Sequence, residues 1–299
     1  MRSSLYPASA GIVACIIWGL SVFFYKSIKG IAPSEILAHR AFWSMVFFLI
    51  ILSFQKKHKV IISNILNWQR LKFYCLATIL ISVNWFGFIY SVKVDNVTQA
   101  SFGYFIFPIV AVCLGYLFNR ERFSTLQIIS ICLASISVLI LGAGLGEFPY
   151  LSLLLATTFG FYGLLKGYVS DNPIISVATE TTLAAPFAIG YILLLRLSNF
   201  SSDFLLGYNS SQFLLLITSG FLTALPLVLF AFAAQSLRYS TVGLINYVNP
   251  TLQFFIAVFI LSESFGYLNL IAFVLIWVGL AFYSYETIRL DSFKNKRVS

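Results

Sequence analysis

Long apolar runs follow one another along the chain, separated by short segments that contain charged residues or Pro, Gly and Asn. An α-helix needs about 20 apolar residues to cross a hydrocarbon layer roughly 30 Å thick, and these runs have that length. The runs are continuous rather than alternating, which excludes the strands of a β-barrel. The predicted transmembrane helices are 6–25, 36–54, 73–92, 97–118, 125–141, 148–165, 174–195, 213–234, 241–261 and 268–285.

Composition leads to the same class of protein. Of 299 residues, 60% are hydrophobic and only 10% are charged, whereas a soluble domain carries about 45–50% apolar and about 25% charged residues. A soluble enzyme, a disordered chain and a disulfide scaffold are therefore excluded. We expect an all-α polytopic membrane protein whose ten transmembrane helices leave only short loops.

The positions of the charges orient the predicted helices. The net charge is +9, and only Lys26, Lys29, Lys93 and Arg196 fall on the outer side if the N-terminus is cytoplasmic. Arg40 lies within a span. The cytoplasmic segments then hold Arg2, Lys56, Lys57, Lys59, Arg70, Lys72, Arg120, Arg122, Lys166, Arg238, Arg289, Lys294, Lys296 and Arg297. This asymmetry follows the positive-inside rule, so both termini are expected in the cytoplasm and no nucleic acid is needed to explain the charge.

The two halves of the chain share a sequence pattern. Two Pro–Glu pairs with equal spacing align without a gap when the sequence is shifted by 142 residues, Pro108 and Glu121 with Pro250 and Glu263. Five spans per copy is an odd number, so the second copy must enter the membrane from the opposite side. We expect two inverted five-helix repeats, 1–145 and 146–299, the second ending in a short basic cytoplasmic tail.

Five stretches carry a resemblance to a known family: EILAHRAFWS at 35–44, VNWFG at 83–87, ASFGYF at 100–105, ETTL at 180–183 and YVNPTLQF at 247–254. Over nearly its full length the chain resembles RarD-type permeases of the EamA branch of the drug/metabolite transporter superfamily. The resemblance implies two EamA-like repeats and a permease for small organic molecules in the bacterial inner membrane. Members are often described as chloramphenicol-resistance permeases, so compounds of that kind are candidate substrates.

Two charged residues lie inside predicted spans, where a charge costs about 2.5–3.5 kcal/mol to insert. Arg40 is expected either to bind an anionic group of a substrate or to extend to the outer interface. Glu180 is a candidate for proton coupling, or else a structural carboxylate bonded to Thr or Tyr neighbours. Their expected depths differ by about 15 Å, which argues against an ion pair and places them on opposite sides of a central cavity. His39 is a second coupling candidate, although packing is the simpler role.

Two prolines near the middle of their spans mark candidate binding positions. Pro108 and Pro250 each remove a backbone hydrogen bond to the residue four positions earlier, Tyr104 and Asn246. Freed backbone groups at this depth are tolerated only against protein or a wet cavity. The expected substrate-binding residues are therefore Arg40, Trp43, Asn84, Trp85, Tyr104, Asn246, Tyr247 and Asn249. The alternative for each helix is an ordinary packed kink.

Glu121 and Glu263 follow the fourth and ninth spans and precede the next helix. Because the helix dipole stabilises an acidic group at a helix N-terminus, both are expected to act as structural caps.

The expected function is secondary transport of small organic solutes across the lipid bilayer, as an exporter that works by alternating access. Protons are a candidate coupling ion. A proton-independent facilitator or exchanger and a metabolite importer remain alternatives, and an integral-membrane enzyme is a more remote one. The sequence contains no GxSxG elbow, no P-loop and no His/Cys/Asp/Glu cluster with metal-ligand spacing, so we expect neither catalysis nor a cofactor.

Overall fold

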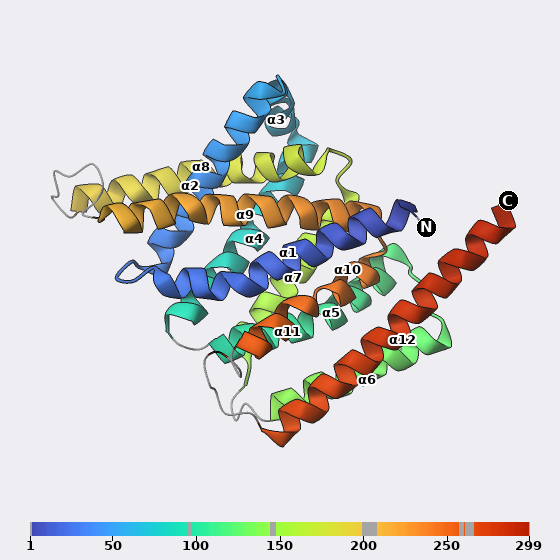
Figure 1. Cartoon of the computed structure of the whole chain (residues 1–299). Coiled ribbons are helices and arrows are strands. Elements are labelled where there is room, and N and C mark those ends of the chain that lie inside the picture. Colours follow the sequence, from blue (N-terminus) through green and yellow to red (C-terminus); the bar gives the residue numbers. More distant parts are fainter. Residues whose placement is uncertain are drawn as a thin grey trace.

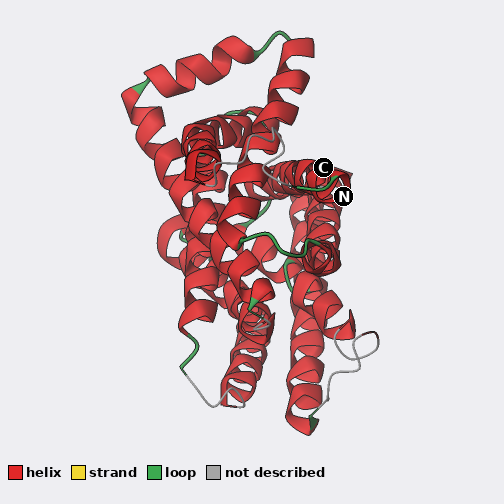
Figure 2. Cartoon of the chain, turned by 90° about the vertical axis from the view of Figure 1, so that its left-hand side faces the viewer, coloured by secondary structure: helices red, strands yellow, loops and turns green. Residues whose placement is uncertain are grey.

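The computed structural model describes residues 2–94, 97–143, 148–198, 208–256, 260 and 266–298, and these residues are helical with connecting loops and no strand (Figure 2). Eight helices in the described chain are long and apolar enough to cross a membrane. The prediction of an all-helical polytopic membrane protein is therefore confirmed. The helices are α1 (Arg2–Ser27), α2 (Pro33–Phe54), α3 (His58–Leu66), α4 (Trp68–Lys93), α5 (Val97–Asn119), α6 (Thr125–Ala143), α7 (Tyr150–Tyr168), α8 (Pro173–Ser198), α9 (Ser210–Ser236), α10 (Tyr239–Ile245), α11 (Val248–Phe255) and α12 (Tyr267–Val298).

Local sequence signals explain several helix starts. Pro33 stands at the first position of α2, where a missing N–H removes no helical bond. Asn67 caps α4 by accepting hydrogen bonds from the next turn. Asn209 and Gln212 form a reciprocal capping box at the start of α9. Gly30 takes a positive φ of 73° between α1 and α2, a conformation that glycine adopts without a steric penalty.

The ninth predicted span differs from the structure. Residues 241–261 were expected to form one kinked helix, but the chain breaks at Asn246–Tyr247 into α10 and α11. Each of the other nine predicted spans overlaps one helix. The short helix α3 was not predicted, because its nine residues lie in a basic segment interpreted as a loop.

The helices pack mainly with partners that are distant in sequence. Helix α2 packs against α8 and α9, α1 against α9, and α7 against both α4 and α5. Helices α6 and α12 form a pair along one margin of the bundle (Figure 1). An aromatic cluster of Trp18, Phe107, Phe159, Tyr162 and Phe230 fills the centre, with ring centroids of Phe159 4.9 Å from those of both Phe107 and Phe230. The candidate site described below lies against this aromatic cluster.

A polar network closes the end of the bundle that contains α3. The carboxylate of Asp171 accepts hydrogen bonds from Asn64 Nδ2 at 2.8 Å and Tyr74 Oη at 2.6 Å, and lies 3.5 Å from Arg70 Nη1. Gln235 Nε2 donates to the Asp171 carbonyl at 3.1 Å. These contacts connect α3, α4, the loop between α7 and α8, and the end of α9.

The opposite end is held by another set of bonds. Lys93 Nζ donates to the carbonyl of Ile28 at the end of α1, and Gln212 Nε2 donates to the carbonyl of Lys29 at 3.0 Å. Tyr208 Oη donates to Glu35 Oε2 at 2.8 Å. Burial and the Glu35 carboxylate raise the pKa of the Tyr208 phenol, so that this group remains a donor.

Candidate functional site

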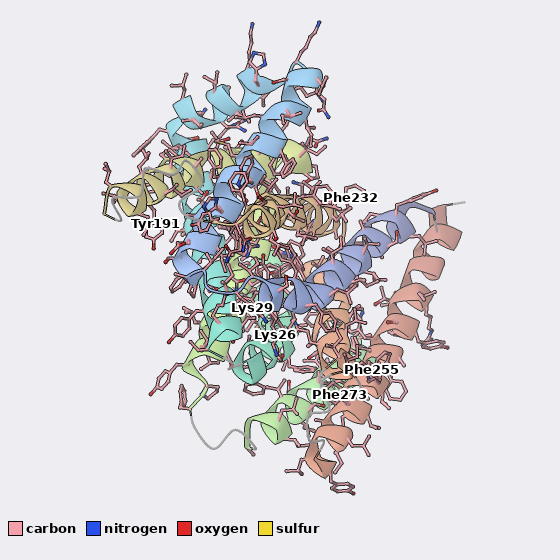
Figure 3. The ribbon with its side chains drawn as sticks, turned by 60° about the vertical axis from the view of Figure 1, so that its left-hand side comes forward. Lys26, Lys29, Tyr191, Phe232, Phe255 and Phe273 are labelled. Atoms are coloured by element: carbon pink, nitrogen blue, oxygen red, sulfur yellow. The ribbon has the colours of Figure 1, made fainter. Side chains whose placement is uncertain are left out.

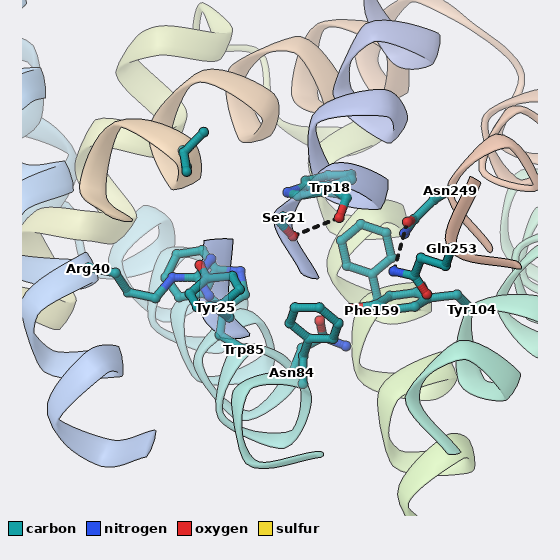
Figure 4. Close-up of a pocket in the computed structure, with 12 residues that line it drawn as sticks. Trp18, Ser21, Tyr25, Arg40, Asn84, Trp85, Tyr104, Phe159, Asn249 and Gln253 are labelled. Atoms are coloured by element: carbon teal, nitrogen blue, oxygen red, sulfur yellow. Dashed lines mark hydrogen bonds between the residues drawn. The ribbon is translucent and has the colours of Figure 1, made fainter. Parts of the chain in front are cut away.

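A small central cavity of about 30 Å³ lies between helices from both halves of the chain (Figure 4). Its walls combine one cation, several amides and hydroxyls, and many aromatic rings, a mixture that suits a small organic ligand. The lining residues are Trp18, Ser21, Tyr25, Arg40, Asn84, Trp85, Phe88, Tyr104, Phe159, Leu222, Asn249 and Gln253.

Arg40 supplies the positive charge of the cavity. Its side chain belongs to α2, is only 4% exposed, and donates from Nε to Thr223 Oγ1 on α9 at 2.9 Å. The guanidinium carbon lies 4.3 Å from the ring centroid of Trp85 and 5.6 Å from that of Tyr25, which are cation–π distances. The side chain thus lines the cavity and does not extend to the outer interface.

The cavity is polar at its other end as well. Gln253 Nε2 donates to Asn249 Oδ1 at 3.1 Å, and Gln253 Oε1 accepts from Ser101 Oγ at 3.0 Å. Figure 4 shows this amide pair beside Tyr104, separated from Arg40 by the aromatic side chains. The site therefore has a cationic end, an apolar middle and an amide end.

Five of the eight predicted binding residues line the cavity: Arg40, Asn84, Trp85, Tyr104 and Asn249. The other three lie outside the lining. Trp43 packs against Phe213 on α9, with ring centroids 6.0 Å apart. Asn246 donates from Nδ2 to the Val242 carbonyl at 3.0 Å, and Tyr247 packs against Phe105.

The two prolines have different surroundings. Pro108 lies within the continuous helix α5, whereas Pro250 is in the first turn of α11, just after the break. The carbonyl of Asn246, which Pro250 deprives of its usual donor, accepts from the Asn249 N–H at 3.1 Å. A free backbone carbonyl was expected at Asn246, but this carbonyl has a partner.

Glu180 is paired, and its partner is Lys166 rather than Arg40. Lys166 Nζ lies 2.5 Å from Glu180 Oε1, with the two side chains 0% and 3% exposed. Tyr162 Oη donates to Glu180 Oε2 at 3.0 Å, and Lys166 Nζ donates to Ser176 Oγ at 2.6 Å. The expectation that Arg40 and Glu180 form no pair is confirmed. The sequence assigned Lys166 to the cytoplasmic side and did not indicate that its ammonium group is buried against a carboxylate.

His39 is buried at 6% exposure and meets the ring of Tyr208 edge-on at 5.5 Å between centroids. Neither ring nitrogen has a hydrogen-bond partner among the described residues. His39 does not line the central cavity.

Glu121 is a helix cap, but it caps α10 and not the helix that follows it in the sequence. Its Oε1 accepts from the Tyr239 N–H at 2.7 Å, and its Oε2 accepts from the Ser240 side chain, at the start of α10. Helix α6, which follows Glu121 directly, is instead preceded by reciprocal bonds between Ser124 and Gln127. Glu263 lies outside the described residues.

Seven lining residues were not predicted: Trp18, Ser21, Tyr25, Phe88, Phe159, Leu222 and Gln253. A signal existed for two of them, since Trp18 and Phe159 align when the sequence is shifted by 141 residues. Their rings meet edge-on at 5.5 Å between centroids. Gln253 belongs to the motif 247–254, but the sequence did not indicate it as a binding residue.

The described residues contain no group of three or more His, Cys, Asp or Glu side chains that could hold a metal ion. Cys15 is buried, and Cys113 and Cys132 are exposed on the surface of the helical bundle.

Comparisons with known proteins identify the family of the chain. The EamA-like transporter family matches residues 6–143. The chain is 36% identical to the uncharacterized transporter YojE of Bacillus subtilis (strain 168) and 34% identical to protein RarD of Escherichia coli (strain K12), with 93% of each chain covered in both cases. A solved crystal structure matches the fold with a TM-score of 0.69 at 14% identity, covering 95% of this chain and 99% of the other. The protein is therefore a membrane transporter rather than an enzyme, and it belongs to the EamA-like transporter family, among the relatives of RarD.

Proposed function

We propose that the protein is a secondary transporter that exports small organic solutes, metabolites or drugs, across the bacterial inner membrane by alternating access. The central cavity carries this proposal. Its walls come from both halves of the chain, with Arg40 and Trp85 from the first half and Phe159 and Asn249 from the second. A site between two such bundles can face either side when one bundle rocks against the other.

We further propose that ten spans form two inverted repeats, residues 1–145 and 146–299, with α10 and α11 together as the ninth span. Helix packing supports this arrangement. If a two-fold axis relates the repeats, α1 corresponds to α7, α2 to α8, α4 to α9, α5 to α10–α11 and α6 to α12. The contact of α1 with α9 then corresponds to that of α7 with α4, and the contact of α5 with α7 to that of α10–α11 with α1. Equivalent spans also pack on each other, as α2 with α8, α5 with α10 and α6 with α12.

The break between α10 and α11 supports a binding role for this region. Discontinuous helices near the middle of the membrane commonly form the binding sites of secondary transporters. Here α11 begins directly after the break and contributes Asn249 and Gln253 to the cavity. Non-helical backbone at this depth is tolerated because protein surrounds it.

The proposed orientation places both termini in the cytoplasm. The end of the bundle with α3, Arg70 and Arg238 holds most of the cations, and the positive-inside rule assigns that end to the cytoplasm. Lys26, Lys29 and Lys93 then lie on the outer side.

Flux in proteoliposomes tests the proposal. Purified protein is reconstituted, and the movement of a mixed metabolite and antibiotic pool is followed with and without an imposed proton gradient. Movement that depends on the protein and follows the gradient is expected for a coupled exporter. Movement that ignores the gradient would favour the facilitator or exchanger, and accumulation toward the cytoplasmic side would favour an importer. Failure of all solutes to move in the presence of protein would contradict the proposal.

A further inference from the structure

Three lysines line one depression at the proposed outer end of the bundle. Lys26 and Lys29 stand at the end of α1 and in the turn after it, and Lys93 is the last residue of α4. The depression, which we name the lysine vestibule, is open and has about 920 Å³ free of atoms, counting space shared with solvent. Figure 3 labels Lys26 and Lys29 close together at this end of α1. Among the described residues, none of the three lysines forms an ion pair.

This placement runs against the charge pattern of the rest of the chain. Only four Lys or Arg residues were assigned to the outer side, and three of them gather in this vestibule. The positive-inside rule disfavours cations here. Helix α1 explains part of the arrangement, since cations are stabilised near a helix C-terminus and Lys93 binds the Ile28 carbonyl. It does not explain Lys29, which lies beyond the helix and is exposed.

The lysine vestibule adjoins the central cavity. Tyr25 lines both spaces, and its ring lies 5.6 Å from the guanidinium carbon of Arg40. Positive side chains therefore follow one another from the outer surface to the buried end of the cavity, with one aromatic ring between them.

Arg40 itself lacks an anionic partner. It is buried, it donates to a neutral hydroxyl and lies against aromatic rings, and no acidic side chain of the described chain forms an ion pair with it. Lys166 in the same bundle shows the contrasting case, with a carboxylate at 2.5 Å. A buried cation without an internal counterion is suited to an anion that arrives from outside the protein.

We propose that the transported solute is an organic anion, whose carboxylate binds the Arg40 guanidinium. The aromatic walls contact its planar or apolar body, and the Asn249–Gln253 pair binds polar groups at its far end. The lysine vestibule raises the local concentration of the anion at the outer mouth, where an exporter releases it and an exchanger would also take it up. This inference rests on the proposed transport function and specifies its substrate class.

Matched acid and amide probes test the binding step. The purified protein is heated in the presence of benzoate or benzamide, and of phenylacetate or phenylacetamide, and its melting temperature is recorded. The acids are expected to raise the melting temperature and the isosteric amides to leave it unchanged. Arg40→Gln is expected to abolish the response to acids, while Lys72→Gln, an exposed cation at the opposite end of α4, retains it. Equal responses to acids and amides, or none to either acid, would overturn the inference.

A second measurement does not depend on the folding of an Arg40 variant. In a protein without its four native cysteines, Ala32→Cys places a thiol on the lysine vestibule, and Phe148→Cys places one at the same end outside it. Rates of modification by an anionic and a cationic methanethiosulfonate are compared. In low salt, the ratio of the anionic to the cationic modification rate is expected to be roughly tenfold higher at Ala32→Cys than at Phe148→Cys. Lys26→Gln with Lys29→Gln is expected to remove most of that preference. Equal ratios of the two modification rates at both positions would contradict the attraction of anions by the lysine vestibule.

These experiments distinguish failure of the anionic-substrate proposal from failure of the proposed transport function. Protein-dependent flux of a neutral solute, without discrimination between acids and amides, would leave the transport function intact and overturn the anionic substrate. Arg40-dependent binding of acids by a protein that moves no solute would support the anion site and contradict the proposed transport function.

Discussion

Lys166 on α7 and Glu180 on α8 form a buried ion pair, with 2.5 Å between Nζ and Oε1. The pair is completed by Ser176 Oγ on the lysine and Tyr162 Oη on the carboxylate. Two opposite charges and two neutral hydroxyls are thus gathered in one buried cluster. Since neither Lys166 nor Glu180 lines the central cavity, the pair lies beside the proposed binding site and not in it.

Removal of one partner should be more harmful than removal of both. Lys166→Met leaves a buried carboxylate without its cation, and a loss of about 3–5 kcal/mol in the free energy of unfolding is expected. Lys166→Met with Glu180→Gln removes both charges and is expected to recover most of that loss. Unfolding in a mixed-micelle titration measures the effect. A double variant as unstable as Lys166→Met would show that the two side chains are not coupled.

The same double variant tests proton coupling. It keeps the packing of α7 against α8 but lacks the protonatable carboxylate, so proton-driven flux is expected to disappear while solute exchange without a gradient continues. Glu286→Gln is a suitable control, because Glu286 is also buried but pairs with Arg289 on α12. Gradient-driven flux at the wild-type rate in the double variant would show that proton coupling does not require Glu180.

Close packing of α2 on α9 should depend on Gly220. A Cβ atom at this position would lie 2.7 Å from the Trp43 carbonyl carbon and 2.8 Å from the Ser44 nitrogen, and Ser44 Oγ already donates to the Gly220 carbonyl. Gly220→Ala is therefore expected to destabilise the protein by about 1–3 kcal/mol. At Gly190 on α8, a Cβ would meet no heavy atom of the described chain within 4 Å. Gly190→Ala is accordingly expected to be neutral or stabilising by up to about 1 kcal/mol. Similar melting temperatures for the two variants would contradict the close approach.

The orientation can be checked by labelling. Single cysteines at Asn209, Lys57 and Arg120 are introduced in a background without the native cysteines and treated with a membrane-impermeant maleimide. The position at Asn209 is expected to react from the periplasmic side, and those at Lys57 and Arg120 only after the cytoplasmic side is exposed. The reverse pattern would invert the topology and move the lysine vestibule to the cytoplasm.

Much of the fold could be predicted because a membrane helix is encoded locally, as an apolar run of sufficient length. The break at Asn246–Tyr247 could not, because the run 241–261 is uninterrupted and Pro250 alone suggests a kink within one helix. Nor could the burial of Lys166, which depends on a carboxylate carried by the next helix.

For the site, the polar residues were easier to find than the aromatic ones. Arg40, Asn84 and Asn249 stand out because polar groups are costly in a bilayer. Trp18 and Tyr25 did not, since a ring in a membrane helix faces lipid, interface or core with the same local sequence. Trp43 was predicted for the cavity, but it lies outside the lining, with its backbone close to Gly220 on α9.

Accessibility of the cavity from the two sides tests alternating access most directly. Ser21→Cys places a thiol on the cavity wall in a background without the native cysteines, and proteoliposomes are treated with a small impermeant thiol reagent from one side at a time. Modification is expected from each side, with binding of a transported solute slowing both reactions. Modification from one side only, under all gradients and solutes, would contradict alternating access across this cavity.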